Sequence, residues 1–264
     1  MGPSIHEYPV YLLQLLTGFR SKHEGMYASL RNQDTADTLG EKSLQVLDLG
    51  NGRLRPQYAL LKMAGHRVCG IDLTNRPSVS AMDFFYKLAR RIYCWKSDVP
   101  KEAISKGTLV CGDVATLPFR PRSFDLVTSI AAFEHFLDVP AVIGELARVV
   151  RLGGLVWVCV HPFTCPSGGH NVSFTQIPLR KIRRGTDAWD HLRRRKIPFD
   201  VPLNEWRIDQ YLDAFARYFE IIKHYCALRE GCEFLTPEIA AELSQYSAEE
   251  LTSHAYVILA RKLP

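Results

Sequence analysis

The segment Val46-Leu47-Asp48-Leu49-Gly50-Asn51-Gly52 constrains the fold of this chain more than any other. An acidic residue ends an apolar run and is followed at once by a Gly-x-Gly turn, which is the pattern of a buried strand that brings a turn against a ligand. Glycine lets such a turn adopt positive φ and approach a bound molecule closely. The segment therefore predicts a parallel α/β sheet with a ligand site at its carboxyl edge.

Short apolar runs continue beyond this segment and alternate with stretches of helical periodicity. The predicted strands span residues 44–49, 67–72, 108–111, 124–129, 155–161, 219–227 and 256–260. The predicted helices are crossovers at 56–64 and 140–150, a helix that starts at Asn204, and helices near 236–251. This alternation is typical of a doubly wound α/β sheet with helices on both faces.

The N-terminal region lies outside this alternation. Its apolar residues at helical spacing are Leu12, Leu15, Leu16 and Phe19. They predict one or two amphipathic helices over residues 8–30, with the polar run 31–42 as a connector. Residues 1–42 are thus expected to form a helical segment that packs on the core or covers the ligand as a lid, before a domain at 43–264.

Residues 162–205 also interrupt the alternation, with prolines, glycines and basic side chains. Eight Lys and Arg residues lie between Arg180 and Lys196, against only Asp187 and Asp190. This segment is either a solvated face or an electropositive rim that attracts an anionic, phosphorylated or membrane-surface partner. Because inserted loops carry specificity more often than the scaffold does, substrate contacts are expected here.

The composition fits a folded domain of a reducing compartment. The chain has 264 residues, 47% of them hydrophobic and 23% charged, which excludes disordered and fibrous classes. No apolar run approaches the ~18 residues of a membrane span, and no signal-peptide pattern is present. Seven cysteines form no CxxC pair and are interpreted as reduced core thiols. A cytoplasmic protein is expected.

Two further carboxylates follow the next two predicted strands. Asp72 ends the second strand and Asp113 the third, each after a glycine-containing stretch. The carboxyl ends of parallel strands meet at one crevice, so Asp48, Asp72 and Asp113 are expected to face the same ligand. A dinucleotide fingerprint needs a third glycine where Arg55 stands, which disfavours a nicotinamide cofactor, although Asp72 would serve either ribose.

Five segments in this order resemble the class I S-adenosylmethionine-dependent methyltransferases. They are residues 46–52, 70–72, 112–119, 123–127 leading into Phe133-Glu134-His135, and 145–154. The resemblance covers residues 44–160. It implies a Rossmann-like methyltransferase fold whose seven-stranded, mostly parallel sheet has an antiparallel last strand, with S-adenosylmethionine as cofactor and S-adenosylhomocysteine as product.

At the methionine end of the cofactor, the resemblance assigns roles by position. Asp48 matches the acidic residue near the methionine amino group. Gly50, Asn51 and Gly52 match the turn beneath the cofactor, although a small residue or Cys is usual in place of Asn51. Ile130, just past the fourth strand, matches a backbone contact to the methionine part.

At the adenosine end, Asp72 matches the ribose ligand and Leu73 lies beside the adenine. Asp113 matches the carboxylate that accepts from the adenine amino group, and Val114 donates its backbone amide nearby. One further departure lies in the glycine-rich turn, where Leu54 stands in place of a usual third glycine. A side chain of this size is expected to narrow the methionine end of the site.

Two histidines at the predicted sheet edge are candidates for catalysis. A hydroxyl acceptor must lose a proton, and a positioned histidine accelerates that step by about 10² to 10⁴. His135 follows the fourth strand and is the first candidate, and His161 closes the fifth and is the second. Each also has a structural interpretation, as a packing residue or as a strand terminator before Pro162. No paired carboxylate and amide ligands indicate a metal.

The predicted function is a methyltransferase of EC class 2.1.1 that acts on an oxygen of a small molecule or of a glycan- or lipid-linked acceptor. The alternative is a methyltransferase-like binding module with impaired catalysis that docks an anionic partner through residues 180–196. Nucleic acid is disfavoured, because Trp189 and Trp206 flank the basic cluster without forming a recognised stacking module. The basic segment leaves room for peripheral contact with a membrane, whereas the N-terminal helix has few basic residues.

Overall fold

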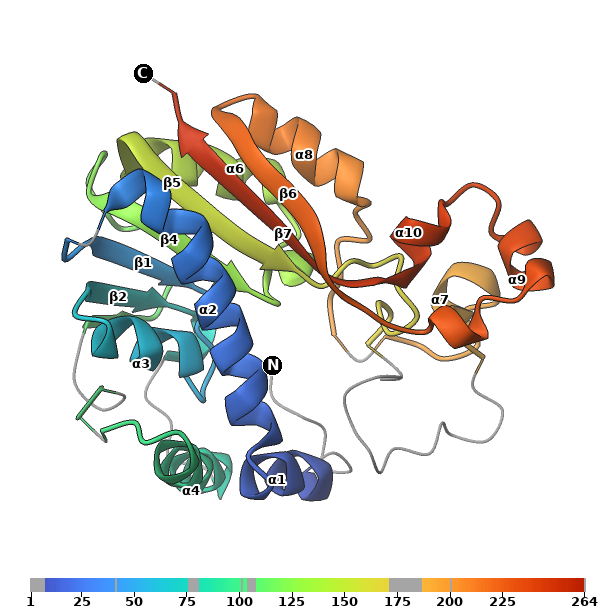
Figure 1. Ribbon diagram of the computed structural model, residues 1–264, viewed down its shortest axis with the longest axis horizontal. Helices are drawn as coiled ribbons and strands as arrows, with labels where there is room; N and C mark the ends of the chain where they lie inside the picture. The colour runs from blue at the N-terminus through green and yellow to red at the C-terminus, as the bar shows by residue number, and fades with distance from the viewer. Residues whose placement is uncertain are drawn as a thin grey trace.

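The computed structural model describes residues 8–40, 42–75, 81–100, 102–103, 108–170, 187–199 and 201–263. Its centre is a seven-stranded sheet in the order β3-β2-β1-β4-β5-β7-β6 (Figure 1). The strands are β1 (Gln45–Leu49), β2 (Arg67–Ile71), β3 (Thr108–Val110), β4 (Phe124–Ile130), β5 (Val150–Val160), β6 (Phe219–Arg229) and β7 (Ser253–Lys262). The first five strands pair in parallel, and β7 is antiparallel to β5 and β6. The predicted sheet is confirmed.

Helices cover both faces of this sheet (Figure 1). The helices are α1 (Tyr8–Leu16), α2 (Phe19–Leu39), α3 (Pro56–Met63), α4 (Ala81–Lys96), α6 (Val139–Val149), α7 (Asp190–Arg193), α8 (Ile208–Ala216), α9 (Pro237–Glu242) and α10 (Ala248–Thr252), with 3₁₀ turns η2 (Leu73–Asn75), η3 (Phe133–His135) and η4 (Cys232–Phe234). One core, which includes Leu146 and Phe215, packs α6 and α8 against the sheet. A second core, which includes Tyr27 and Trp157, packs α2 and α3 against the opposite face.

Helix α2 extends to Leu39 and is therefore longer than the sequence predicted. The connector expected at 31–42 is wrong for residues 31–39, which are helical. The reason is a set of polar residues that are buried because they have partners. Asp34 accepts hydrogen bonds from Trp157 Nε1 (2.9 Å) and Tyr225 Oη (2.7 Å), and its carboxylate is 2.7 Å from Lys223 Nζ. A polar run that looks like a loop is therefore the second half of a helix, and its few buried polar residues include Asp34, which ties it to β5 and β6.

The prediction also omitted α4 and placed the start of α8 too early. Helix α4 carries apolar residues on its solvent side as well, since Phe84 and Trp95 are 72% and 70% exposed. Helix α8 begins at Ile208 rather than at Asn204. The helices predicted near 236–251 are present as α9 and α10, and Thr236 and Ser247 cap them, because both side chains accept from backbone amides in the first turn of their helices.

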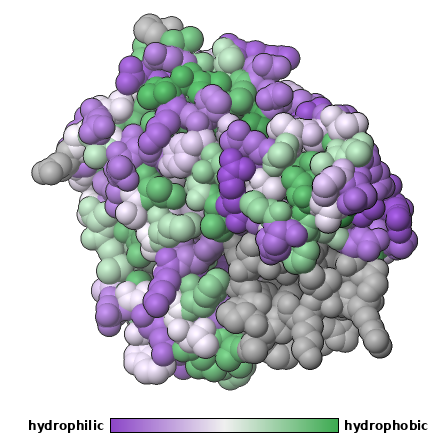
Figure 2. Space-filling view, turned by 45° about the vertical axis from the view of Figure 1, so that its right-hand side comes forward, coloured by the Kyte–Doolittle hydropathy of each residue, from purple (hydrophilic) through white to green (hydrophobic). Residues whose placement is uncertain are grey.

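The described part of the insertion belongs to a small lobe beside the sheet (Figure 1). Trp189, just before α7, is fully buried with Leu243 and Leu251 from the segment between β6 and β7. Its indole nitrogen donates to Leu251 O at 3.0 Å. Figure 2 turns this side of the molecule toward the viewer, and hydrophilic side chains cover much of its right-hand edge.

All seven cysteines are free thiols, but the expectation of core thiols holds for four of them only, because Cys226 is half-buried and two others are exposed. Cys111 and Cys232 are exposed, whereas Cys69, Cys94 and Cys159 are among the buried ones. Among the helices that the structure describes, none combines the length and apolar character needed to cross a membrane.

Candidate active site

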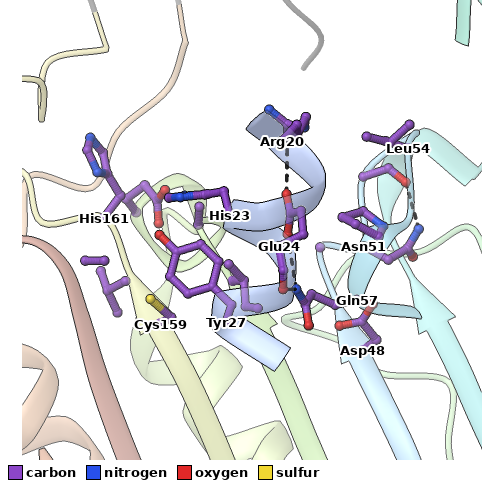
Figure 3. A pocket seen from close by; sticks show the side chains of 18 of the residues that line it. Arg20, His23, Glu24, Tyr27, Asp48, Asn51, Leu54, Gln57, Cys159 and His161 are labelled. Atoms are coloured by element: carbon purple, nitrogen blue, oxygen red, sulfur yellow. Dashed lines mark hydrogen bonds and ion pairs between the residues drawn. The ribbon is translucent and has the colours of Figure 1, made fainter. Parts of the chain in front are cut away.

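A pocket of about 490 Å³ opens at the carboxyl ends of β1, β4 and β5. Its size is in the usual range for small-molecule sites, about 300–1,000 Å³. Helix α2 lies across it, with Asp48 and Asn51 on one side and Cys159 and His161 on the other (Figure 3). The pocket is therefore enclosed by the sheet edge and by the N-terminal helical segment together.

The turn after β1 forms one wall of the pocket. Gly50 and Gly52 have φ of 63° and 61°, and a Cβ on Gly50 would lie 2.5 Å from Ala132 Cβ. Glycine is required at position 50 both for this conformation and for the close approach. Asn51 is buried and lines the pocket, with its side chain bonded to that of Asn75. The predicted residues of this turn thus share one wall.

Asp48 lies at the base of the pocket and is 2% exposed. Its Oδ1 accepts from Thr128 Oγ1 at 3.0 Å, while Oδ2 is buried and has no hydrogen-bond partner among the described residues. Burial raises the pKa of Asp48 to about 7, and the Thr128 hydrogen bond and the Arg31 charge oppose that rise. An unpaired buried carboxylate oxygen in a pocket fits an ammonium group of a ligand.

Residues predicted to hold the adenosine lie along the same edge of the sheet but outside the pocket lining. Asp72 Oδ2 accepts from Gly52 N (2.8 Å) and Oδ1 from Thr74 N (2.7 Å), so it holds two turns in place. Leu73 is 66% exposed, and Asp113 is exposed and accepts from Ala115 N at 2.9 Å. Val114 is buried in the core of the α6 face. Their contacts to a cofactor remain predictions.

Helix α2 contributes charged residues that the sequence analysis missed. Arg20, His23, Glu24 and Tyr27 all line the pocket. Glu24 is buried, its Oε2 accepts from Gln57 Nε2 at 3.1 Å, and its Oε1 is 3.7 Å from Arg20 Nη2. The recurrence of these residues about one helical turn apart was the available signal, but the hydrophobic pattern alone did not indicate which face met the pocket.

Leu54, at the position of the usual third glycine, is 4% exposed and lines the pocket. Its side chain also belongs to a small core with Leu15, Ala59 and Tyr93, where α1, α3 and α4 meet. The leucine therefore joins the pocket wall to the packing of the N-terminal helices. Ile130 lines the pocket as well, at the end of β4.

His161 lines the pocket and belongs to a polar cluster behind it. Its Nδ1 is 2.9 Å from His254 O, and its Nε2 is 3.2 Å from Ser167 Oγ and 3.8 Å from Cys165 Sγ. Glu230 pairs with His254 at 3.0 Å and accepts from Ser167. Burial raises the pKa of the Cys165 thiol, which keeps it protonated at neutral pH.

His135 is near the pocket but does not line it. Its Nδ1 is 3.0 Å from Pro202 O, and its ring centroid is 4.8 Å from that of His170, which does line the pocket. Between them, Glu134 is 2% exposed, faces the pocket, and has no hydrogen-bond partner on either carboxylate oxygen within the described part of the chain. Burial lowers the pKa of His170 well below its usual value.

Two groups of side chains here have donor atoms within 4.8 Å of one another, as metal ligands would: His161 with Cys165 and His254, and Glu134 with His135 and His170. Sequence spacing did not reveal either group, because each joins segments that meet only in the fold. In the sequence, the residues of the second group belong to two separate segments, Phe133-Glu134-His135 and Gly168-Gly169-His170, and neither segment alone indicates a metal site.

The described part of the basic segment is not a patch of unpaired cations. Each cation pairs with a carboxylate: Arg193 with Glu242 (2.5 Å), Arg194 and Lys196 with Asp187 (3.4 and 3.8 Å), and Arg195 with Glu205 (2.5 Å). These ion pairs offset part of the positive charge at 193–196, and the electropositive rim stays a prediction. Residues 180–184 lie outside the described residues.

Comparisons with known proteins agree on one class. Residues 47–158 match the methyltransferase domain family. A sterol 24-C-methyltransferase of Gibberella zeae, ERG6B, is 28% identical over 200 residues, covering 72% of this chain and 43% of that protein. A demethylmenaquinone methyltransferase of Mycobacterium sp. (strain KMS) is 34% identical over 122 residues, covering 43% and 51%. This chain spans about half the length of these curated relatives.

Among solved structures, an S-adenosylmethionine dependent methyltransferase from Mesorhizobium loti superposes with a TM-score of 0.52 at 19% identity. The superposition covers 87% of this chain and 96% of that one. At this level of identity the likeness shows the fold.

Proposed function

Residues 47–158 of this chain form a methyltransferase domain with the class I S-adenosylmethionine-dependent fold, and from this premise we propose that the protein methylates an oxygen of a small-molecule or a glycan- or lipid-linked acceptor. The observation that carries the proposal is the Oδ2 of Asp48, which is buried in the pocket beside the Gly50–Gly52 turn and has no hydrogen-bond partner among the described residues. This oxygen is the proposed acceptor for the amino group of the methionine part.

The rest of the pocket suits the same cofactor. Arg20, from α2, supplies a positive charge for the methionine carboxylate. Asp72 fixes Gly52 and would receive the ribose hydroxyls at the end of β2, while Leu73, Asp113 and Val114 continue the site toward the adenine. The three buried pocket acids, Glu24, Asp48 and Glu134, complement a ligand that carries a sulfonium charge.

S-adenosylmethionine supplies an activated methyl group on a positively charged sulfur. The protein's task is to align an acceptor with that group, and positioning of this kind contributes roughly 7 to 11 kcal/mol. His135 and His161 are the proposed proton acceptors for a hydroxyl. His161 lines the pocket, whereas His135 reaches it beside Glu134 and His170.

A carbon acceptor is the second candidate, because one relative is named as a sterol C-methyltransferase. Incubation with carbon-13-labelled cofactor and a panel of phenols, sterols and polyprenyl-linked sugars, followed by NMR of the products, distinguishes an O-methyl from a C-methyl group. An exclusively C-methylated product would contradict the oxygen acceptor and leave the methyltransferase intact.

The first test is calorimetric titration with S-adenosylhomocysteine, with NAD as the matched ligand control. We expect binding of the former only, weakened more than tenfold in Asp48→Asn because the amide cannot pair with the ammonium as a carboxylate does. Folded wild-type protein that does not bind S-adenosylhomocysteine would overturn the proposal.

The alternative is a binding module with impaired catalysis that docks an anionic partner through residues 180–196, and Leu54 in the glycine-rich turn motivates it. If Leu54 blocks the methionine end, Leu54→Gly is expected to raise turnover; if the leucine is mainly a packing residue, the variant loses stability with no gain in activity. Leu54→Ala, which keeps an ordinary backbone, separates the effect of side-chain size from that of glycine flexibility.

A further inference from the structure

Glu134, His135 and His170 come together beside the pocket, where the turn after β4 meets the segment after β5. Their ligand atoms all lie within 4.8 Å of one another, and His135 Nε2 is 4.0 Å from Glu134 Oε1. Nitrogen and oxygen ligands lie about 2.0–2.2 Å from a zinc ion, so two ligands of one ion are at most about 4.4 Å apart. Small side-chain rotations would bring all three onto one ion.

Several ligand atoms of this group lack the hydrogen bonds that buried polar atoms normally have. Both carboxylate oxygens of Glu134 and the Nε2 of His170 are buried and unpartnered within the residues that the structure describes. Glu134 is 2% exposed, so water does not simply replace the missing partners. Buried ligand atoms without a partner on two of the three residues of this group indicate a missing ligand.

The surrounding chain holds these groups in a ligand-ready arrangement. The Nδ1 of His135 faces Pro202 O at 3.0 Å, which leaves Nε2 as the lone-pair nitrogen, as in many metal-binding histidines. Asn204 clamps the η3 turn, because its Nδ2 donates to Phe133 O (2.7 Å) and Phe136 O (3.0 Å). His170 has a φ of 56°, an uncommon conformation that is concentrated at functional sites.

The neighbouring cluster of His161, Cys165 and His254 is a weaker candidate. There, His161 and His254 already contact Ser167 and Glu230 in a closed hydrogen-bond network. A metal would have to break these contacts and remove the proton of a buried thiol. Occupancy of that cluster is the main competing outcome of the experiment below.

We propose that Glu134, His135 and His170 bind a divalent first-row transition metal ion, such as Zn²⁺, in front of the methyl-donor pocket. Two imidazoles and one carboxylate suit such ions and not Mg²⁺, which prefers oxygen ligands. The metal site stands independently of the activity, and its role in the reaction rests on the proposed function.

In that role the ion would bind the acceptor oxygen and lower the pKa of its hydroxyl. Because His135 would then hold the ion and no longer accept a proton, the hydroxyl proton passes to solvent. An oxygen lone pair forms the new bond to the methyl carbon, and the carbon–sulfur pair returns to sulfur, which becomes a neutral thioether. Acceptors that offer an acidic or chelating hydroxyl, such as phenols and catechols, are the class that fits.

The test is titration of chelator-treated, full-length protein with Co²⁺, followed by visible and near-ultraviolet absorption. We expect one saturable site with cobalt d–d bands and without a thiolate-to-cobalt charge-transfer band. Glu134→Gln and His170→Ala should each lower Co²⁺ affinity more than about 100-fold, since loss of a group that merely orients a ligand already costs about 10- to 100-fold.

The matched controls are Cys165→Ser, which disables the competing cluster, and His224→Ala, which removes an exposed histidine on β6. Both should bind Co²⁺ like wild type. A charge-transfer band, or loss of binding in Cys165→Ser, would place the ion at the other cluster and overturn the proposal, and so would the absence of saturable binding.

Two further measurements distinguish failure of the metal-site proposal from a structural role of Glu134 and from failure of the proposed function. Glu134→Gln replaces a buried carboxylate that has no hydrogen-bond partner among the described residues, with little change in shape, so the metal-free variant should be at least as stable as wild type. A clear loss of stability would indicate a structural role and count against the site. S-adenosylhomocysteine binding by the metal-free wild type reports on the proposed function alone.

Discussion

The surroundings of Asp48 raise its pKa, and this makes the stability of the folded protein depend on pH. Its pKa is about 7 in the folded protein, against 3.8 for an ordinary Asp, because burial penalises the charge. Between these values the folded state keeps a proton that the unfolded chain has lost. Stability therefore falls as pH rises through this window, at up to about 1.4 kcal/mol per pH unit.

Asp48→Asn should remove this pH dependence. Relative to wild type without ligand, the variant gains stability between pH 5 and pH 8, by a few kcal/mol. Urea unfolding of both proteins at the two pH values measures the gain. Parallel stability curves would show that Asp48 is already ionised at pH 5.

Asp72 holds the neighbouring backbone in place and is also the predicted ribose ligand. Because its carboxylate holds Gly52 and Thr74, a substitution affects the turn as well as any ribose contact. Asp72→Ala is expected to weaken S-adenosylhomocysteine binding by about 1.5–3 kcal/mol while the protein stays folded. Calorimetry together with an unfolding curve checks this, and unchanged affinity would show that the ribose lies elsewhere.

At the scale of elements, α2 joins the pocket to the far edge of the sheet. Its first half supplies Arg20 and Glu24 to the pocket, and its second half is tied through Asp34 to Trp157, Lys223 and Tyr225. Hydrogen bonds of this kind hold a helix in one register along a sheet. The lid role of residues 1–42 remains a prediction, although the position of α2 over the pocket supports it.

Asp34→Ala tests this attachment. The variant leaves a buried indole N–H and a tyrosine hydroxyl without their acceptor, so we expect a loss of about 3 kcal/mol in unfolding free energy. Asp37→Ala, on the exposed side of the same helix, is the control and should change stability by less than about 0.5 kcal/mol. Equal losses in the two variants would mean that helix propensity, not the buried contact, is responsible.

The strands were predictable because a buried parallel strand is a short apolar run, and such a run is visible in the sequence. The second half of α2 was not, because its polar residues are buried only by virtue of partners from β5 and β6. Asp48 and the glycine turn could be found because they belong to one continuous motif. Glu134 and His170 could not, since they are 36 positions apart and become neighbours only when the chain folds.

For the molecule as a whole, a ligand that binds only the folded state must raise its stability. At a concentration 100 times its Kd, S-adenosylhomocysteine should add about 2.7 kcal/mol. This corresponds to a rise in Tm of roughly 5–10 °C for a chain of this size. Thermal unfolding with and without the ligand, and with NAD as control, measures it, and an equal shift with NAD would point to a different cofactor.

The small core of Trp189, Leu243 and Leu251 limits which segments can be exchanged between related proteins during evolution. Because this core joins two distant stretches of chain, neither stretch can be exchanged alone without exposing the other's apolar side chains. Grafting from a relative would succeed only if both stretches were transplanted as a pair. The sheet and its glycine turn could then stay unchanged while the two stretches that form this core are replaced together as one unit.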